Sequence, residues 1–177
     1  MKKFLFIFCF LFAFALSSQA QDNVSLPAQY QKMMEKILGN LPKVATSKAN
    51  SLLDFAKSMI GVPYRYASSN PNRGFDCSGF VSYVFGNFGF KVPRSSPEFA
   101  STGVPVKLSE AKVGDVLIFT GTSHKSKRIG HVGIIYSIDD EGNIKFIHST
   151  SGKANGVTIT DFDNYYKGRF IKAVSIM

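Results

Sequence analysis

The chain has 177 residues, of which 45% are hydrophobic, and it carries a formal net charge of +9 at pH 7. This length suffices for one domain with a substantial core and requires no second domain. The only cysteines are Cys9 and Cys77, so we expect no disulfide framework.

The first 20 residues have the pattern of a secretory signal peptide. Lys2 and Lys3 precede an unbroken apolar run over residues 4–16, and the small residues at positions 18 and 20 fit a cleavage site. The run is shorter than the roughly 20 residues that a membrane-spanning helix needs. A retained anchor is the alternative, whereas lipid attachment at Cys9 is disfavoured because Cys9 lies inside the run. We expect an exported protein, periplasmic or extracellular, whose mature chain begins at Gln21.

The charge of the expected mature chain favours an anionic partner. Loss of Lys2 and Lys3 leaves a formal charge of +7. Cell-wall polymers and anionic lipids both suit such a charge. Nucleic acid is not expected, because an exported protein rarely meets it and the basic residues are scattered along the chain. We expect a monomer that needs no cofactor or metal.

A linker is predicted between the signal peptide and the domain. Residues 21–49 are polar and mixed, with one apolar piece of helical spacing over residues 30–38. Gly39 and Pro42 are typical helix terminators, so we predict only a helical turn or two in this linker. The domain itself is predicted to cover residues 50–177.

Two helices are predicted at the start of the domain. The first covers residues 51–60 and ends at Gly61, since its apolar residues follow helical spacing. The second starts at Asp76-Cys77, and Gly89 lies where a C-terminal cap belongs. Its apolar stripe must face the core and consists of Phe80, Val81, Val84, Phe85 and Phe88.

Beyond Gly114 the sequence pattern becomes that of strands. Runs rich in β-branched and aromatic residues are separated by Gly, Asp and Asn. These runs cover residues 116–120, 131–138, 144–148, 157–160 and 169–176. Helices followed by strands predict an α+β domain.

Cys77 is the only thiol of the expected mature chain. An unpaired cysteine is most often a small buried hydrophobic residue. However, Asp76 is expected to cap the second helix, which places Cys77 in its first turn. The positive end of the helix dipole there favours the thiolate and would lower the pKa of Cys77. Together with the polar neighbours Asp76 and Ser78, this position favours a functional site.

A thiol nucleophile needs a base, and the chain offers His124, His131 and His148. His124 lies in a basic loop and is expected to be solvated. His131 opens one predicted strand and His148 closes the next, with a hairpin turn within residues 139–143. The centre of that turn decides whether the two histidines lie opposite each other or are offset by about three residues, unless a bulge restores the register. A zinc site formed by these cysteine and histidine side chains is a weaker alternative.

Several short motifs resemble those of the NlpC-type family of cell-wall cysteine peptidases, which belongs to the papain-like superfamily. In chain order they are Gly-Val-Pro-Tyr at 61–64, Gly-Phe-Asp-Cys-Ser-Gly-Phe-Val at 74–81, Gly-Asp-Val at 114–116 and Gly-His-Val-Gly-Ile at 130–134. The match covers about residues 50–175. The resemblance implies a papain-like domain in which N-terminal helices pack on an antiparallel sheet.

The resemblance also implies an activity and its residues. Cys77 would be the nucleophile, His131 the base and His148 the polar residue that orients the base. Members of the family typically cut the γ-D-glutamyl bond to the diamino acid in peptidoglycan stem peptides.

The family positions that line the oxyanion and substrate subsites match Tyr64, Asp76 and Ser78. The chain departs from the family pattern at Ala67 and Ser68, where paired glycines are usual, and near Phe99, where a glutamine is often found. A papain-like amidase and a non-catalytic cell-wall-binding module are the alternatives.

Overall fold

The structure is a computed structural model that describes residues 27–122 and 127–177. The expected signal peptide, its cleavage site and His124 lie outside these residues. The chain divides into two units, and the division falls between Ile37 and Leu38. Within the described ranges, no helix is long and apolar enough to cross a membrane.

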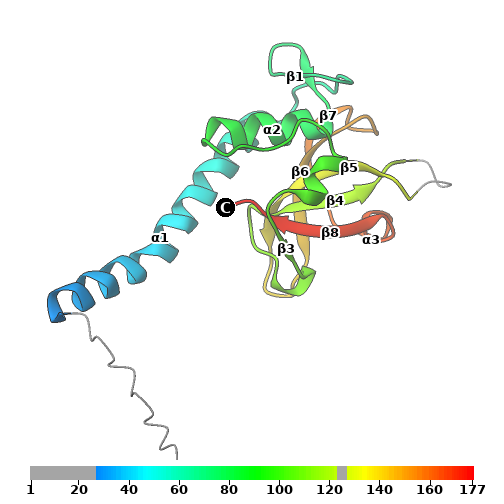
Figure 1. Cartoon of the computed structure of the whole chain (residues 1–177). Coiled ribbons are helices and arrows are strands. Elements are labelled where there is room, and N and C mark those ends of the chain that lie inside the picture. Colours follow the sequence, from blue (N-terminus) through cyan, green and yellow to red (C-terminus); the bar gives the residue numbers. More distant parts are fainter. Residues whose placement is uncertain (1–26, 123–126) are drawn as a thin grey trace, which may run out of the picture. The chain divides into compact units, whose positions relative to one another are not determined.

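Helix α1 covers Ala28–Ser58 (Figure 1). The predicted short helix in a linker, followed by a separate helix from residue 51, is therefore wrong. Gly39 and Pro42 lie inside α1. They cost about 1 and 3 kcal/mol relative to alanine, but they do not forbid a helix when residues of helical spacing continue on both sides. The domain boundary at residue 50 stays a prediction.

Six antiparallel strands form the main sheet, in the order β3-β8-β4-β5-β6-β7. Their bounds are Val104–Val106 (β3), Val116–Thr120 (β4), Ile129–Ile138 (β5), Ile144–Thr150 (β6), Gly156–Asp161 (β7) and Phe170–Ser175 (β8). The five predicted strands and the α+β class are confirmed. Strand β3 escaped prediction because it has only three residues, one of which is Pro105.

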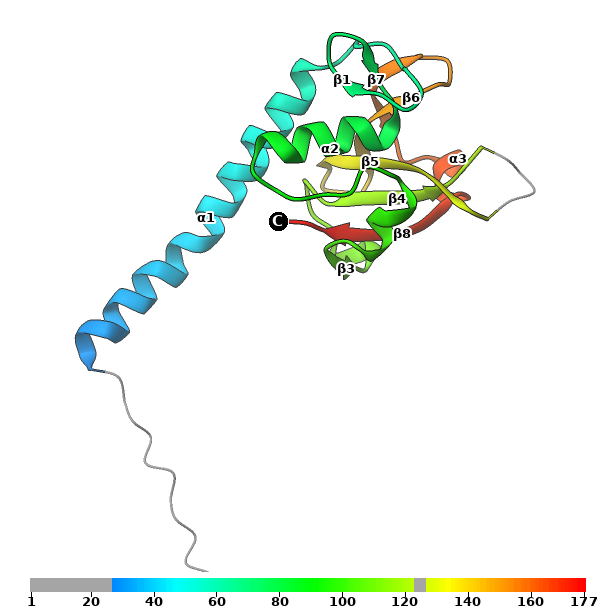
Figure 2. The same cartoon turned by 45° about the horizontal axis from the view of Figure 1, so that its top comes forward.

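The remaining elements are short apart from α2, which covers Cys77–Asn87. They are the hairpin strands β1 (Ser69–Asn70) and β2 (Gly74–Phe75), the 3₁₀ helices Pro97–Ser101 and Leu108–Glu110, and helix α3 (Asn164–Lys167). Figures 1 and 2 show α2 lying along β5. Its bounds confirm the prediction of a second helix that starts at the cysteine.

The core has two apolar clusters, one on each face of the sheet. In β4, Val116 and Ile118 belong to the cluster that includes α2, whereas Leu117 and Phe119 belong to the other. This alternation follows from the two-residue period of a strand. Since β4 is buried on both faces, its neighbour β5 is held firmly, and β5 carries His131.

Candidate active site

The start of α2 is fixed by a side-chain cap. The Oδ1 atom of Asp76 accepts a hydrogen bond of 2.6 Å from the backbone N–H of Gly79. This satisfies one of the free amides of the first turn and confirms the predicted cap. Cys77 is consequently the first residue of the helix, and it is only 8% exposed.

Arg94 neutralises the capping carboxylate, a contact that the sequence did not indicate. Its Nη1 and Nη2 atoms donate to the two oxygens of Asp76 at 2.9 and 2.6 Å. Nη1 also donates to the Ser78 hydroxyl at 3.2 Å. Asp76 and Ser78, both predicted site residues, thus form one cluster with Arg94 beside the sulfur of Cys77.

The thiol of Cys77 is held as a neutral group. Burial raises its pKa and the nearby Asp76 carboxylate adds to this, while backbone hydrogen bonds from Val132, Ser78 and Cys77 itself act in the opposite direction. The sulfur lies 3.8 Å from the carbonyl oxygen of Gly130. The expected lowering of the cysteine pKa is therefore wrong, because burial outweighs the helix terminus.

A bulge sets the register between β5 and β6. Ile138 pairs with Ile144, the register shifts between Ile135 and Ser137, and Ile134 then pairs with Ile147. Continuing this register places His148 opposite Gly133, so that His131 lies two residues further along the same face. The sequence left open whether the histidines lie directly opposite each other or are offset by about three residues. The observed offset lies between these two arrangements.

The two histidines contact each other directly. The Nε2 atom of His131 lies 2.8 Å from Nδ1 of His148. On its other side, Nε2 of His148 lies 2.9 Å from the Thr160 hydroxyl oxygen. Thr160 comes from β7, which pairs with β6, and it was not among the predicted site residues. The site therefore contains a hydrogen-bonded series of three side chains, His131, His148 and Thr160.

These two hydrogen bonds fix the tautomers of His131 and His148 if His131 is to act as a base. A base must leave Nδ1 of His131 unprotonated, so Nε2–H donates to Nδ1 of His148. The Nε2–H group of His148 then donates to the Thr160 hydroxyl. Each donor has one acceptor, and the His131 ring is held in a single orientation.

Gly133 makes room for this contact. A Cβ atom at Gly133 would lie 2.6 Å from a ring carbon of Phe146 and 3.0 Å from the Cβ of His148. No real Cβ makes a contact as short as the first, so a side chain here would push strand β6 or its side chains away. The bare backbone of Gly133 therefore allows His148 to reach His131.

We expect Gly133→Ala to lower turnover at this site by about 100-fold, because misplacement of a catalytic group by about 1 Å has that effect. Gly86→Ala is the matched control, since a Cβ at Gly86 in α2 meets no atom within 4 Å. Turnover and thermal unfolding of both variants check this expectation. Equal turnover in the two variants would contradict the importance given to Gly133.

Both histidines are neutral in the folded protein. Burial lowers the pKa of His131 well below its usual 6.5, and His148 and Arg169 lower it further. The pKa of His148 is lowered to about 3, again by burial first and then by Arg169. The resting site therefore contains a neutral thiol and two neutral imidazoles.

These pKa shifts predict how stability depends on pH. Unfolded histidines bind protons below about pH 6.5 while the folded ones do not, so the free energy of unfolding falls as the pH drops below 6.5. Each histidine contributes a slope of up to about 1.4 kcal/mol per pH unit. Denaturant unfolding between pH 7 and pH 4.5 measures this slope. We expect His148→Asn to reduce this slope by up to about 1.4 kcal/mol per pH unit, because one histidine that titrates on unfolding is lost. Equal slopes for the two proteins would contradict a lowered pKa of His148 in the folded protein.

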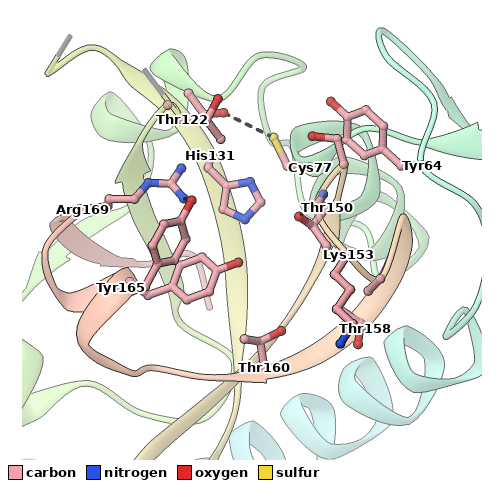
Figure 3. Close-up of a pocket in the computed structure, with 16 residues that line it drawn as sticks. Tyr64, Cys77, Thr122, His131, Thr150, Lys153, Thr158, Thr160, Tyr165 and Arg169 are labelled. Atoms are coloured by element: carbon pink, nitrogen blue, oxygen red, sulfur yellow. Dashed lines mark hydrogen bonds between the residues drawn. The ribbon is translucent and has the colours of Figure 1, made fainter. Parts of the chain in front are cut away.

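Two cavities meet at Cys77. The larger has a volume of about 950 Å³ and the smaller one of about 410 Å³. Tyr64, Cys77 and Gly130 line both, whereas His131 lines only the larger and Asp76, Ser78 and Arg94 line only the smaller. Figure 3 shows the sulfur of Cys77 between the ring of His131 and the ring of Tyr64. A bound chain that crosses the sulfur would thus place one part in each cavity.

Comparison with known proteins identifies the family of the chain. Residues 61–175 match the profile of the NlpC/P60 family. The chain belongs to this family. It is 31% identical over 138 residues to a Haemophilus influenzae protein named probable endopeptidase NlpC homolog, with 74% of this chain and 67% of that protein covered.

Two further NlpC/P60 relatives extend the comparison. A Bacillus subtilis protein named gamma-DL-glutamyl hydrolase is 32% identical over 133 residues, which cover 73% of this chain and 30% of that protein. The crystal structure of an NlpC/P60 family protein from Bacillus cereus superposes with a TM-score of 0.63 at 27% identity, and covers 72% of this chain and 40% of that one. The chain spans less than half the length of several curated relatives that it matches.

Over residues 27–122 and 127–177, no three histidine, cysteine, aspartate or glutamate side chains gather as metal ligands would. Instead, His131 and His148 direct ring nitrogens at each other.

Proposed function

We propose that the protein is an exported cysteine peptidase that hydrolyses peptidoglycan stem peptides at the bond between γ-D-glutamate and the diamino acid. The observation that carries the proposal is the position of Cys77 at the start of α2, where two cavities meet beside the His131–His148 pair. The B. subtilis relative named gamma-DL-glutamyl hydrolase supports the choice of bond. The expected signal peptide supports export.

In the first half of the reaction, Cys77 attacks the amide carbonyl of the substrate. As the S–C bond forms, the thiol proton moves to Nδ1 of His131, which is neutral and free to accept it. The C–N bond then breaks, and His131 returns the proton to the leaving amine. A thioester between Cys77 and the glutamyl group remains.

In the second half, water hydrolyses the thioester. His131 takes a proton from the water as its oxygen bonds to the carbonyl carbon, and the C–S bond breaks. The proton on His131 then returns to the sulfur. His148 holds the ring of His131 in the required tautomer throughout, and Thr160 holds His148.

The oxyanion of each tetrahedral intermediate needs donors that are already in place. The backbone amide of Cys77, at the free start of α2, and the hydroxyl of Tyr64 supply them. Figure 3 shows the Tyr64 side chain on one side of the Cys77 sulfur. Asp76, Ser78 and Arg94 line the smaller cavity, where they would contact the acyl half of the substrate.

Digestion of purified peptidoglycan tests the proposal. The mature protein should release fragments whose masses correspond to cleavage between glutamate and the diamino acid. Release of whole stem peptides from the sugar would identify an amidase instead. Binding without released fragments would identify a non-catalytic module and would contradict the proposal.

A further inference from the structure

Three aromatic rings surround the histidine pair. The ring centre of Phe119, on β4, lies 5.8 Å from that of His131, and the ring centre of Phe146, on β6, lies 4.5 Å from that of His148. The third ring belongs to Tyr166 on α3. Its centre lies 6.2 Å from that of His131 and 5.6 Å from that of His148. Tyr166 therefore contacts both members of the pair.

Tyr166 is held in place through its backbone and its ring. Helix α3 begins at a cap, in which the side chain of Asp163 accepts a hydrogen bond of 3.1 Å from the backbone N–H of Tyr166. The Tyr166 ring packs on Phe119 and Phe146, with 5.4 and 4.8 Å between the ring centres. The residue is only 9% exposed. The ring cannot turn away from the histidines without losing this packing.

Tyr166 separates His148 from the larger cavity. His148 is fully buried and does not line that cavity, whereas Tyr166 and Thr160 both line it. Both of them also contact His148, Thr160 at Nε2 and Tyr166 edge to face across the ring. Replacement of the Tyr166 ring by a smaller side chain would therefore open a path for water from the cavity to His148.

Water at His148 would favour its charged form. A protonated imidazole has two donors and no acceptor, so His148 could no longer accept the Nε2–H of His131. The orientation of the base would then be lost. A dry surrounding has the opposite effect, because it disfavours the charge and strengthens the hydrogen bond between the two rings. Burial is in fact the first cause of the lowered pKa of each histidine.

Other groups also face the pair. The ionisable side chains that line the larger cavity beside His131 are Tyr64, Cys77, Lys153, Tyr165 and Arg169, in addition to Tyr166. Strands β4, β6 and β7 present Phe119, Phe146 and Thr160, which do not titrate. The charge of Arg169 lowers the pKa of both histidines, and its guanidinium carbon lies 5.7 Å from the centre of the Tyr166 ring. An Arg169 variant is therefore part of the test.

We propose that Tyr166 is a positioning residue whose ring keeps water from the His131–His148 pair, so that His148 remains an acceptor for His131. The proposal rests on the proposed function in one respect, namely that His131 acts as the base. Neither the motifs nor the resemblance gave Tyr166 a function.

NMR titration of protein labelled with ¹⁵N-histidine tests the proposal without any substrate. In the wild-type protein, neither His131 nor His148 should titrate between pH 7.5 and pH 4.5. In Tyr166→Leu protein, His148 should titrate within this range, which is a rise of about 2 pH units from its pKa of about 3. Tyr166→Phe keeps the ring and loses only the hydroxyl, so it should behave like the wild type.

Phe162→Leu is the matched control. It removes a ring from the same core cluster, but this ring contacts Phe119 and Phe170, with 6.1 and 5.5 Å between the ring centres. The two histidines should therefore titrate as in the wild type. Arg169→Gln should raise the pKa of His148 by less than Tyr166→Leu does, because burial is the larger cause.

A second variant covers the case that Tyr166→Leu does not fold, as thermal unfolding would show. Methionine fills irregular gaps but has no rigid ring face, so Tyr166→Met should raise the pKa of His148 in the same direction by a smaller amount.

The pH dependence of hydrolysis gives a separate readout. In Tyr166→Leu protein, the acidic limb of kcat/KM for a γ-D-glutamyl peptide should move to higher pH, and kcat at pH 7.5 should fall by about 10- to 100-fold. A merely structural function of the ring would lower kcat at every pH and leave the limb in place.

Unchanged histidine titrations in Tyr166→Leu protein would overturn the proposal. An equally large rise in Phe162→Leu or Arg169→Gln protein would overturn it as well. If the expected rise occurs but the wild-type protein cuts no peptide, the shielding by Tyr166 is supported and the proposed hydrolysis alone fails. Peptide cleavage with unchanged titrations would overturn only the function given to Tyr166.

Discussion

Cys77→Ala should abolish hydrolysis of a γ-D-glutamyl peptide, with a loss on the order of 10⁴- to 10⁶-fold in kcat. The reason is that no other group at the junction of the two cavities can form the thioester. Steady-state turnover with purified variant protein measures the loss. Cys77→Ser keeps a hydroxyl in place of the thiol, and we expect it to be nearly as inactive because His131 is arranged for a more acidic nucleophile.

Folding of the variant is the necessary control. Cys77 is buried, but alanine is only slightly smaller, so the cost should be about 1 kcal/mol and the fold should persist. Circular dichroism and thermal unfolding check this. Folded Cys77→Ala protein that turns over like the wild type would contradict the proposed mechanism.

The second large effect concerns the histidine pair, whose members should differ. His131→Ala removes the base, and we expect a loss comparable to that of Cys77→Ala. His148 only orients the base, so His148→Ala should lose about 10- to 100-fold. His148→Asn should keep more activity than His148→Ala, because its Oδ1 atom can stand where Nδ1 accepts from His131.

The comparison of His148→Asn with His148→Gln refines this test. The oxygen of glutamine lies one bond further along the side chain, nearer to the place of Nε2, and so it suits the contact with His131 less well. The expected order of turnover is wild type, Asn, Gln, Ala. Equal loss in all three His148 variants would contradict the orienting function while leaving Cys77 as the nucleophile.

Local patterns in the sequence sufficed for the elements that position Cys77 and the histidines. The start of α2 was predictable because Asp76 is a typical N-cap, and the long strands were predictable from their β-branched runs. The full length of helix α1 was not predictable, because Gly39 and Pro42 usually terminate helices. A long helix can nevertheless contain both residues despite their unfavourable helix propensity.

The parts that sequence reasoning missed depend on contacts between distant segments. Thr160 reaches His148 only through the pairing of β6 with β7, and the pairing register of the histidines depends on the bulge near Tyr136. Arg94 contacts Asp76 from 18 residues further along the chain, and Arg169 contacts the carbonyl of Thr120 from 49 residues further along. The raised pKa of Cys77 likewise follows from burial, which the helix position alone does not reveal.

Capture of the acyl-enzyme by hydroxylamine tests whether a thioester forms on Cys77. Hydroxylamine attacks a thioester readily and does not cut a stable amide under mild conditions. Turnover of a γ-D-glutamyl peptide in the presence of hydroxylamine should therefore give the glutamyl γ-hydroxamate beside the free acid, as identified by mass. The hydroxamate fraction should rise with hydroxylamine concentration, and Cys77→Ala protein should form neither product. Continued release of the free acid with no hydroxamate at any concentration would mean that water attacks the amide directly, and it would contradict a thioester intermediate on Cys77.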